Sequence, residues 1–210
     1  MTRLEDDGSA LAIFAELVGA GVEKGASVLN TMLQAQIRMN VPFVRALTLD
    51  ELTDELTTLG GARLSSVDLG FRGDFTGLAQ LIFPAETASK LVAAVTGDDT
   101  VMEEFDAIHA GTLCEVGNIV LNGVMGSMSN RLRLHLSYSV PNYVEGTIRE
   151  LLAAHHQQKA TVFLLARTRF SVESLEIDGD IVLFFEVASF AELLELIECY
   201  DGRKRNSEQS

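Results

Sequence analysis

The segment LCEVGNIVLNGVMGSMSN, residues 113–130, places a carboxylate and two amides at a spacing that a helix would bring together. Glu115 and Asn118 are three residues apart, and Asn122 follows four residues later, so a helix would put them on one face. A carboxamide can accept a hydrogen bond through its C=O while its NH₂ group donates elsewhere, and a carboxylate can make charge-assisted contacts. Glu-x-x-Asn alone occurs by chance in many proteins of this size, so the surrounding pattern has to decide whether it carries function.

On a helical wheel at about 100° per residue, this segment has two stripes. The apolar stripe contains Leu113, Val116, Val120, Leu121, Val124 and Met128. The second stripe contains Glu115, Asn118, Asn122, Gly126 and Ser129. We expect the apolar stripe to face a sheet and the other to face solvent or a partner. Asn and Gly each cost roughly 0.5–1 kcal/mol relative to Ala inside a helix, and the stripe has no Lys or Arg. A flat, amide-bearing face of this kind indicates docking.

The composition limits the possible partners and location of the chain. Its 210 residues carry a formal net charge of -14, with a pI of about 4.6. The dense basic cluster, residues 203–205, is expected in a solvated tail, so nucleic-acid binding is excluded. We expect no secretory signal at the N-terminus, and no apolar run reaches the roughly 18 residues of a membrane span. Cys114 and Cys199 fit no disulfide or metal pattern. A cytoplasmic location is therefore predicted.

The chain repeats one order of elements twice. In the first half we expect a helix over 11–36, a strand over 37–43, a short helix over 48–59, strands over 62–72 and 75–83, and a helix over 85–95. The second half matches with a helix over 101–130, a strand over 132–140, a helix over 146–156, strands over 160–174 and 180–187, and a helix over 188–198. Pro42 and Pro141 close the first strand of each half, and Gly73 and Asp178-Gly179 mark the hairpin turns.

This order predicts an α+β fold that is internally duplicated, with antiparallel strands and long helices packed on the sheet. The chain would be a single domain over residues 1–210, made of two pseudo-repeats at about 10–97 and about 101–200. The offset between them is about 100 residues.

Spacing beyond the helix gives the pattern more weight. Between Asn118 and Pro141 lie 22 residues, the rest of the helix and one strand. This arrangement resembles the chemotaxis phosphatase family of CheC, CheX and FliY. The family signature is an acidic residue or Ser, three positions, Glu, two positions, Asn, 22 positions and Pro. Glu115, Asn118 and Pro141 match it, whereas Gly111 departs from it at the first element. The resemblance implies a CheC-like fold.

The first half contains a second, altered copy of the motif. Its phrase ELVGAGVEKGASVLN resembles the family's usual EIGNIGAGNAATALS, with Glu16 in place and Gly19 where the amide belongs. Again 22 residues separate Gly19 from Pro42. Glu23 stands at the place of Asn122 and would repel a phosphoryl group. We expect a degenerate first site at Glu16 and Gly19, because Gly19 has no side chain to hold water.

The resemblance implies a phosphatase, a hydrolase that acts on the phospho-aspartate of a response-regulator receiver domain of the CheY type, in chemotaxis or two-component signalling. Asn118 would orient the attacking water, Glu115 would contact the receiver's lysine, and Asn122, Gly126 and Ser129 would bind the partner. Positioning of this kind is most of the catalysis available in phosphoryl transfer. No cofactor is expected on this chain, and the Mg²⁺ is expected on the partner receiver.

Two alternatives stay open. One is a non-catalytic regulator of the same fold that sequesters a phosphorylated receiver, binds a CheD-like deamidase or sits in a flagellar switch. The other is a generic α+β domain in which Glu-x-x-Asn is coincidental. A metal site is not predicted, because the adjacent histidines His155 and His156 point in different directions on a helix and lack further ligands. His109 and His135 are expected to be ordinary surface or boundary residues.

Overall fold

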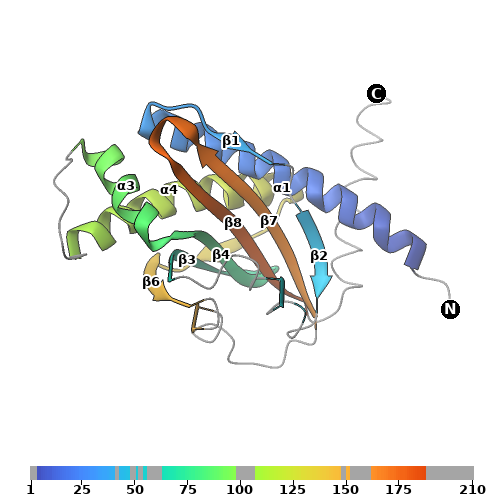
Figure 1. Ribbon diagram of the computed structural model, residues 1–210. Helices are drawn as coiled ribbons and strands as arrows, with labels where there is room; N and C mark the ends of the chain where they lie inside the picture. Colours follow the sequence, from blue (N-terminus) through green and yellow to red (C-terminus); the bar gives the residue numbers. More distant parts are fainter. Residues whose placement is uncertain are drawn as a thin grey trace.

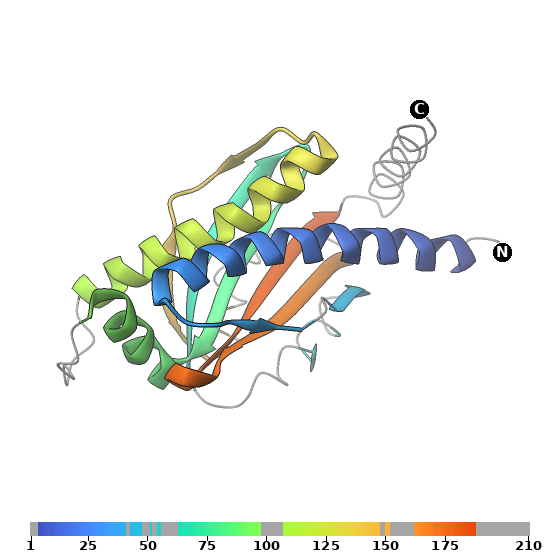
Figure 2. The ribbon, with the colours of Figure 1, turned by 90° about the horizontal axis from the view of Figure 1, so that it is seen from above.

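A computed structural model describes residues 4–40, 43–47, 51, 54–55, 63–97, 107–147, 150–151 and 162–187. Within these residues three helices lie on one face of an antiparallel sheet, as Figures 1 and 2 show: α1 (Leu4–Leu33), α3 (Ala85–Thr96) and α4 (Ala107–Leu132). The helices α1 and α4 run side by side across the sheet, and α3 covers one end of it. The predicted α+β fold with an antiparallel sheet and packed helices is confirmed.

The sheet consists of β1 (Arg38–Met39), β2 (Phe43–Leu47), β3 (Leu64–Gly73), β4 (Thr76–Pro84), β5 (Leu136–Tyr138), β6 (Asn142–Gly146), β7 (Val162–Val172) and β8 (Ile177–Val187). The strand order is β1-β7-β8-β4-β3-β5. Beside this path β2 also pairs with β7, and β6 also pairs with β3. Each half therefore places its first two strands against the hairpin of the other half.

The strands β1 and β2 pair with β7 in the same register in which β5 and β6 pair with β3. Phe43 of β2 lies opposite Arg167 of β7. Asn142, 99 residues after Phe43, lies opposite Asp68, which is 99 residues before Arg167. The same displacement of 99 relates the β1–β7 pairs to the β5–β3 pairs. The two halves thus share one residue-by-residue correspondence through these strands, and it maps α4 onto α1.

The main core lies between the helices and the sheet. Phe14 of α1 packs edge-on against Phe185 of β8, with ring centroids 5.2 Å apart. Glycines let the two long helices approach closely: a Cβ on Gly21 would lie 2.8 Å from the carbonyl oxygen of Val124, and one on Gly25 would lie 2.9 Å from a Val124 methyl group. The position of α4 is therefore fixed from two sides, by α1 and by the sheet.

The opposite face of the sheet carries buried polar groups that the sequence analysis did not anticipate. Val67 and Leu69 belong to the helix-side core, so alternation directs Ser66 and Asp68 to the other face. There Ser66 donates a hydrogen bond to Asp68, and Gln80 Nε2 donates to Asp68 Oδ1 at 2.8 Å. In a second pair, Arg167 Nε donates to Asp180 Oδ1 at 2.8 Å. Gln80 and Asp68 come from neighbouring strands, as do Arg167 and Asp180, so only the paired sheet brings these partners together.

Most predicted elements agree with the structure. The strands predicted at 62–72 and 75–83 are β3 and β4, those at 160–174 and 180–187 are β7 and β8, and both pairs are antiparallel. The helix predicted at 85–95 is α3, and Gly73 ends β3 at the hairpin turn with a φ of 147°. Most of 48–59 and 146–156, all of 188–198 and Pro42 lie outside the described residues.

Three predictions were wrong. Asp178-Gly179 lies inside β8, and the turn before β8 is a 3₁₀ segment, Glu173–Leu175, followed by Glu176 at a φ of 51°. The alternation over 132–140 does not form one strand, because α4 extends to Leu132 and β5 contains only three residues. Likewise 37–43 contains the whole of the two-residue strand β1 and the first residue of β2 rather than a single strand.

Candidate functional site

The inner side of α4 is the apolar stripe that the sequence predicts. Its members are all buried: Leu113, Val116, Val120, Leu121, Val124 and Met128. Gly117 lies among them and contacts the sheet so closely that an added Cβ would be 2.4 Å from a methyl group of Val67. Because the sheet holds this side, the opposite side of α4 is turned outward.

The outer side of α4 carries the predicted docking stripe, which we define as Glu115, Asn118, Asn122, Gly126 and Ser129. None of the five is buried; Glu115 is exposed and the other four are partly exposed. Glu115 forms no ion pair with any described residue. A Cβ added to Gly126 would meet nothing within 4 Å, so the stripe is open at its middle. The stripe is where the wheel predicts it, while the roles of its residues stay predictions.

Inside the stripe the two amides contact each other. Asn122 Nδ2 donates a hydrogen bond to Asn118 Oδ1 at 2.6 Å, across one turn of α4. The bond occupies one lone pair of the Asn118 carbonyl and leaves its second lone pair and its NH₂ group available. The Asn118 side chain can therefore still bind a water molecule or a partner group.

The stripe continues onto β5, which the sequence analysis missed. Ser129 Oγ and the Tyr138 hydroxyl are 3.1 Å apart, within hydrogen-bond distance. Tyr138 is 36% exposed, and Val140, two residues later, is 86% exposed. The Tyr138 ring therefore extends the docking stripe beyond α4. The alternation of 132–140 contained Tyr138, but it gave no sign that its hydroxyl would contact Ser129 of α4.

The first half presents a different surface on α1. Subtracting 99 maps Glu115, Asn118 and Asn122 onto Glu16, Gly19 and Glu23. Glu16 and Glu23 are exposed and Gly19 is partly exposed, so this stripe also points outward. It carries the carboxylates of Glu16 and Glu23, but neither Gly19 nor Glu23 supplies the carboxamide that Asn118 and Asn122 supply on α4. The predicted degenerate site thus has an outward-facing place on α1 but lacks the amide chemistry.

Comparisons with known proteins agree with this arrangement. The family model described as "Chemotaxis phosphatase CheX" matches residues 66–165, which include the docking stripe and Pro141. The CheY-P phosphatase CheC of Bacillus subtilis is 31% identical to this chain over 134 residues, which are 61% of the chain and 63% of that relative. Over these residues the chain is similar to the CheC/CheX-like chemotaxis phosphatases.

Solved structures of chemotaxis and flagellar proteins share the fold. FliY of Thermotoga maritima superposes with a TM-score of 0.68 at 15% identity and covers 97% of this chain and 100% of its own. The middle domain of FliM from H. pylori gives a TM-score of 0.63 at 13% identity, over 90% and 98% of the two chains. CheX in the CheX-CheY-BeF3-Mg²⁺ complex from Borrelia burgdorferi gives 0.53 at 21%, over 79% and 95%. At these identities the likeness establishes the fold alone.

The match to the family model bears on the two halves differently. The matched region begins at residue 66, after the end of α1, so it covers Glu115 and Asn118 but not Glu16 or Gly19. The chain spans 63% of the length of the curated relative that it matches. Pro141, the last element of the signature, lies between β5 and β6 rather than directly at the end of a strand.

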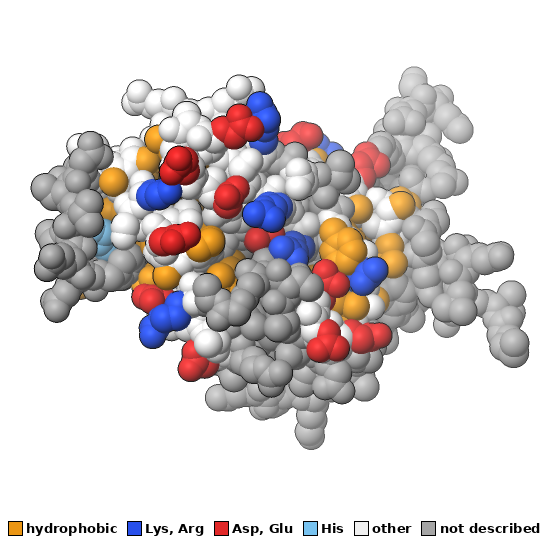
Figure 3. Space-filling model, in the orientation of Figure 1, with side chains coloured by type: hydrophobic (Ala, Val, Ile, Leu, Met, Phe, Trp, Pro, Cys, Tyr) orange, Lys and Arg blue, Asp and Glu red, His pale blue; other side chains and the backbone are white. Residues whose placement is uncertain are grey.

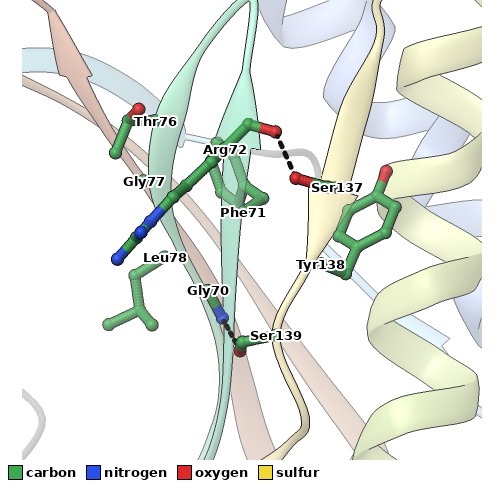
Figure 4. A pocket seen from close by; sticks show the side chains of 9 residues that line it. All are labelled: Gly70, Phe71, Arg72, Thr76, Gly77, Leu78, Ser137, Tyr138 and Ser139. Carbon is green, nitrogen blue, oxygen red and sulfur yellow. Dashed lines mark hydrogen bonds between the residues drawn. The ribbon is translucent and has the colours of Figure 1, made fainter.

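A separate groove lies across β3, β4 and β5, with a volume of about 490 Å³. Figure 4 shows its lining, where the Arg72 side chain extends along the groove and Ser137 donates to the Arg72 carbonyl oxygen at 3.1 Å. Tyr138, one of its lining residues, also contacts the docking stripe through Ser129. Glu115 and Asn118 do not line the groove. The motif therefore lies outside this groove, on the outward side of α4.

Burial and local hydrogen bonds shift the pKa values of several titratable groups of the second half. Burial raises the pKa of the Cys114 thiol, which disfavours the reactive thiolate. Burial also raises the pKa of Tyr143, whose hydroxyl lies 2.9 Å from Ser65 Oγ. Hydrogen bonds from the backbone and hydroxyl of Thr147 lower the pKa of Glu150. None of these groups belongs to the docking stripe.

In the described part of the chain, no three His, Cys, Asp or Glu side chains are grouped so that they could hold a metal ion. His155 and His156 lie outside it, so the prediction of no metal site stays a prediction. No described helix is long and apolar enough to span a membrane. Acidic and basic side chains are interspersed on the face drawn in Figure 3.

Proposed function

We propose that this protein hydrolyses the phospho-aspartate of a CheY-like receiver domain. The observation that carries the proposal is the outward Asn118 carboxamide, one turn from the exposed Glu115, within the segment that matches the CheX family model. The CheC relative is named a CheY-P phosphatase, and one structural neighbour is a CheX bound to CheY with BeF3 and Mg²⁺. Receiver domains of this type are therefore the proposed substrate.

For this hydrolysis the chain mainly has to position the attacking water. An acyl phosphate is already reactive, and the receiver brings its own Mg²⁺ and lysine to neutralise the phosphoryl oxygens. What is missing is a water molecule held in line with the bond that breaks. The Asn118 carbonyl can accept a hydrogen bond from that water and so aim the water's lone pair at phosphorus. It need not act as a strong base.

Glu115 fixes the register of the two proteins. It is exposed, lies three residues before Asn118 and therefore projects from the same side of α4. A carboxylate that enters the receiver pocket can form a charge-assisted contact with the lysine there. Asn122, Gly126, Ser129 and the neighbouring Tyr138 then form the flat surface around the insertion point.

The test measures the lifetime of a phosphorylated receiver. Bacillus subtilis CheY, phosphorylated with acetyl phosphate, and the receivers of this chain's own organism serve as substrates. We expect the wild-type protein to shorten the lifetime of at least one receiver. Asn118→Ala should lower kcat by about 100-fold, because a misplaced water loses most of the positioning effect. The matched variant Gly19→Ala should behave as wild type.

Equal decay with the wild type and with Asn118→Ala would end the assignment of Asn118. If both proteins also bound the phosphorylated receiver equally without shortening its lifetime, the chain would be a non-catalytic regulator. A CheD-like deamidase is tested separately by binding, since the docking stripe gives no specific argument for it.

A further inference from the structure

We propose that Asn122 is a positioning residue that holds the Asn118 carboxamide in its working orientation, rather than only a contact for the partner. The inference rests on the proposed function. It starts from the 2.6 Å hydrogen bond in which Asn122 Nδ2 donates to Asn118 Oδ1. Both side chains are partly exposed, so the pair is formed at the surface where a partner would dock.

The pair is self-contained. Among the described residues, the side chains of Asn118 and Asn122 have no hydrogen-bond partner other than each other. No side chain from the sheet or from α1 therefore competes for the Asn118 amide. The turn beyond is open, because a Cβ on Gly126 would meet nothing within 4 Å. Crowding does not force the two amides together, and the hydrogen bond itself sets their geometry.

An asparagine needs such support to act as a water-binding group. Its terminal torsion is broad and roughly two-fold, so an isolated Asn118 could present either its C=O or its NH₂ group to the partner. Because Asn122 binds one lone pair of Oδ1, the carbonyl stays on the Asn122 side with its second lone pair directed elsewhere. The amide thus enters the receiver pocket already oriented, and the cost of ordering it there is reduced.

The first half supports the view that the two amides work as a unit. There the positions equivalent to Asn118 and Asn122 are Gly19 and Glu23, so both amides are absent together. A carboxylate at 23 has no proton to donate and no carboxamide to orient. The positions next to them keep their character, since Glu115 corresponds to Glu16.

The experiment separates positioning from docking. Steady-state hydrolysis of phosphorylated Bacillus subtilis CheY gives kcat and KM, and binding to the same CheY activated with beryllofluoride and Mg²⁺ gives Kd. We expect Asn122→Ala to lower kcat about threefold to tenfold, the loss of one hydrogen bond, with Kd unchanged within about twofold. Asn122→Gln should restore part of kcat, because a Gln can still donate to Asn118 at this spacing. Glu23→Ala, the matched change on α1, should alter neither constant.

A second measurement does not depend on turnover. Relaxation of the Asn118 side-chain ¹⁵N in the free protein reports the order of the carboxamide, and we expect that order to fall in Asn122→Ala and to recover in Asn122→Gln. The inference is overturned if kcat is unchanged, if Kd rises as much as kcat/KM falls, or if the order of Asn118 does not change. If the wild type hydrolyses no receiver, the proposed function fails, and the relaxation data alone decide whether Asn122 orients Asn118.

Discussion

Helices α1 and α4 occupy equivalent places in the two halves and end in the same way. Leu33 and Leu132 are their last residues, and the next residues, Gln34 and Arg133, have φ values of 49° and 58°. A left-handed residue after the last turn is a common way to end a helix. The scaffold has therefore kept its geometry in both halves, while only α4 carries the paired amides. The comparison teaches that the fold does not need the amides, which points to a role outside folding.

The inner sides of the two helices differ in where the small residue lies. On α4 the small residue is on the helix, where Gly117 contacts Val67 of β3. At the equivalent places the helix carries Val18 and the strand carries Ala166, both buried. The two halves thus exchange side-chain volume between helix and strand.

The largest expected difference between the two outer stripes concerns their glutamates. Glu115→Ala should lower kcat/KM about 10-fold to 100-fold, since a hydrogen bond to a charged group is worth about 1.5–3 kcal/mol. Most of the loss should be in KM, because Glu115 holds the receiver in register. The same substitution at Glu16 should leave both constants unchanged. Comparable losses from Glu16→Ala would show that the first half also binds the substrate.

A smaller effect separates the inner and outer sides of α4. Gly117→Ala should lower the free energy of unfolding by about 1–3 kcal/mol, because the new methyl group overlaps Val67. Gly126→Ala should leave it unchanged or raise it by up to about 1 kcal/mol, since the site is open and Ala favours the helix. Urea denaturation of the two variants checks this, and similar stabilities would mean that α4 is not pressed against β3 at Gly117.

The smallest expected effect concerns the reactivity of the thiol on α4. Cys114 should react with iodoacetamide more slowly than a free thiol at pH 8, because burial raises its pKa and keeps it in the neutral form. The rate should rise only as the pH passes that raised pKa. Cys199→Ser removes the second thiol from the measurement. A fast reaction at pH 7 would contradict a structural role for Cys114.

The sequence predicted the fold where a regular pattern met a simple geometry. Alternation located β3, β4, β7 and β8, and helical spacing located both sides of α4. It failed where the chain deviates from ideal elements: Asp178-Gly179 is typical of a turn, yet the turn is made by Glu173–Leu175 and Glu176. It also could not show that α4 continues through Leu132, because that residue suits the strand pattern as well as the helix.

In the candidate site, too, the sequence predicted the features that depend on one helix and not those that depend on tertiary contacts or side-chain torsions. The outward position of Asn118 followed from the wheel, because it depends on one helix alone. The contact between Ser129 and Tyr138 depends on how β5 turns back beside α4, and spacing along the chain does not contain that information. The donor direction between Asn122 and Asn118 depends on side-chain torsions, which a pattern of residue types leaves open.

We propose that the docking stripe of α4, and not its counterpart on α1, meets the receiver's phosphorylation site. A structure of this protein bound to beryllofluoride-activated CheY with Mg²⁺ tests this most directly. We predict that the Asn118 carboxamide is the group of this chain nearest to the beryllofluoride and that Glu115 contacts the receiver's lysine. A complex in which the receiver is seated on α1, or in which Asn118 remains in solvent, would contradict the account.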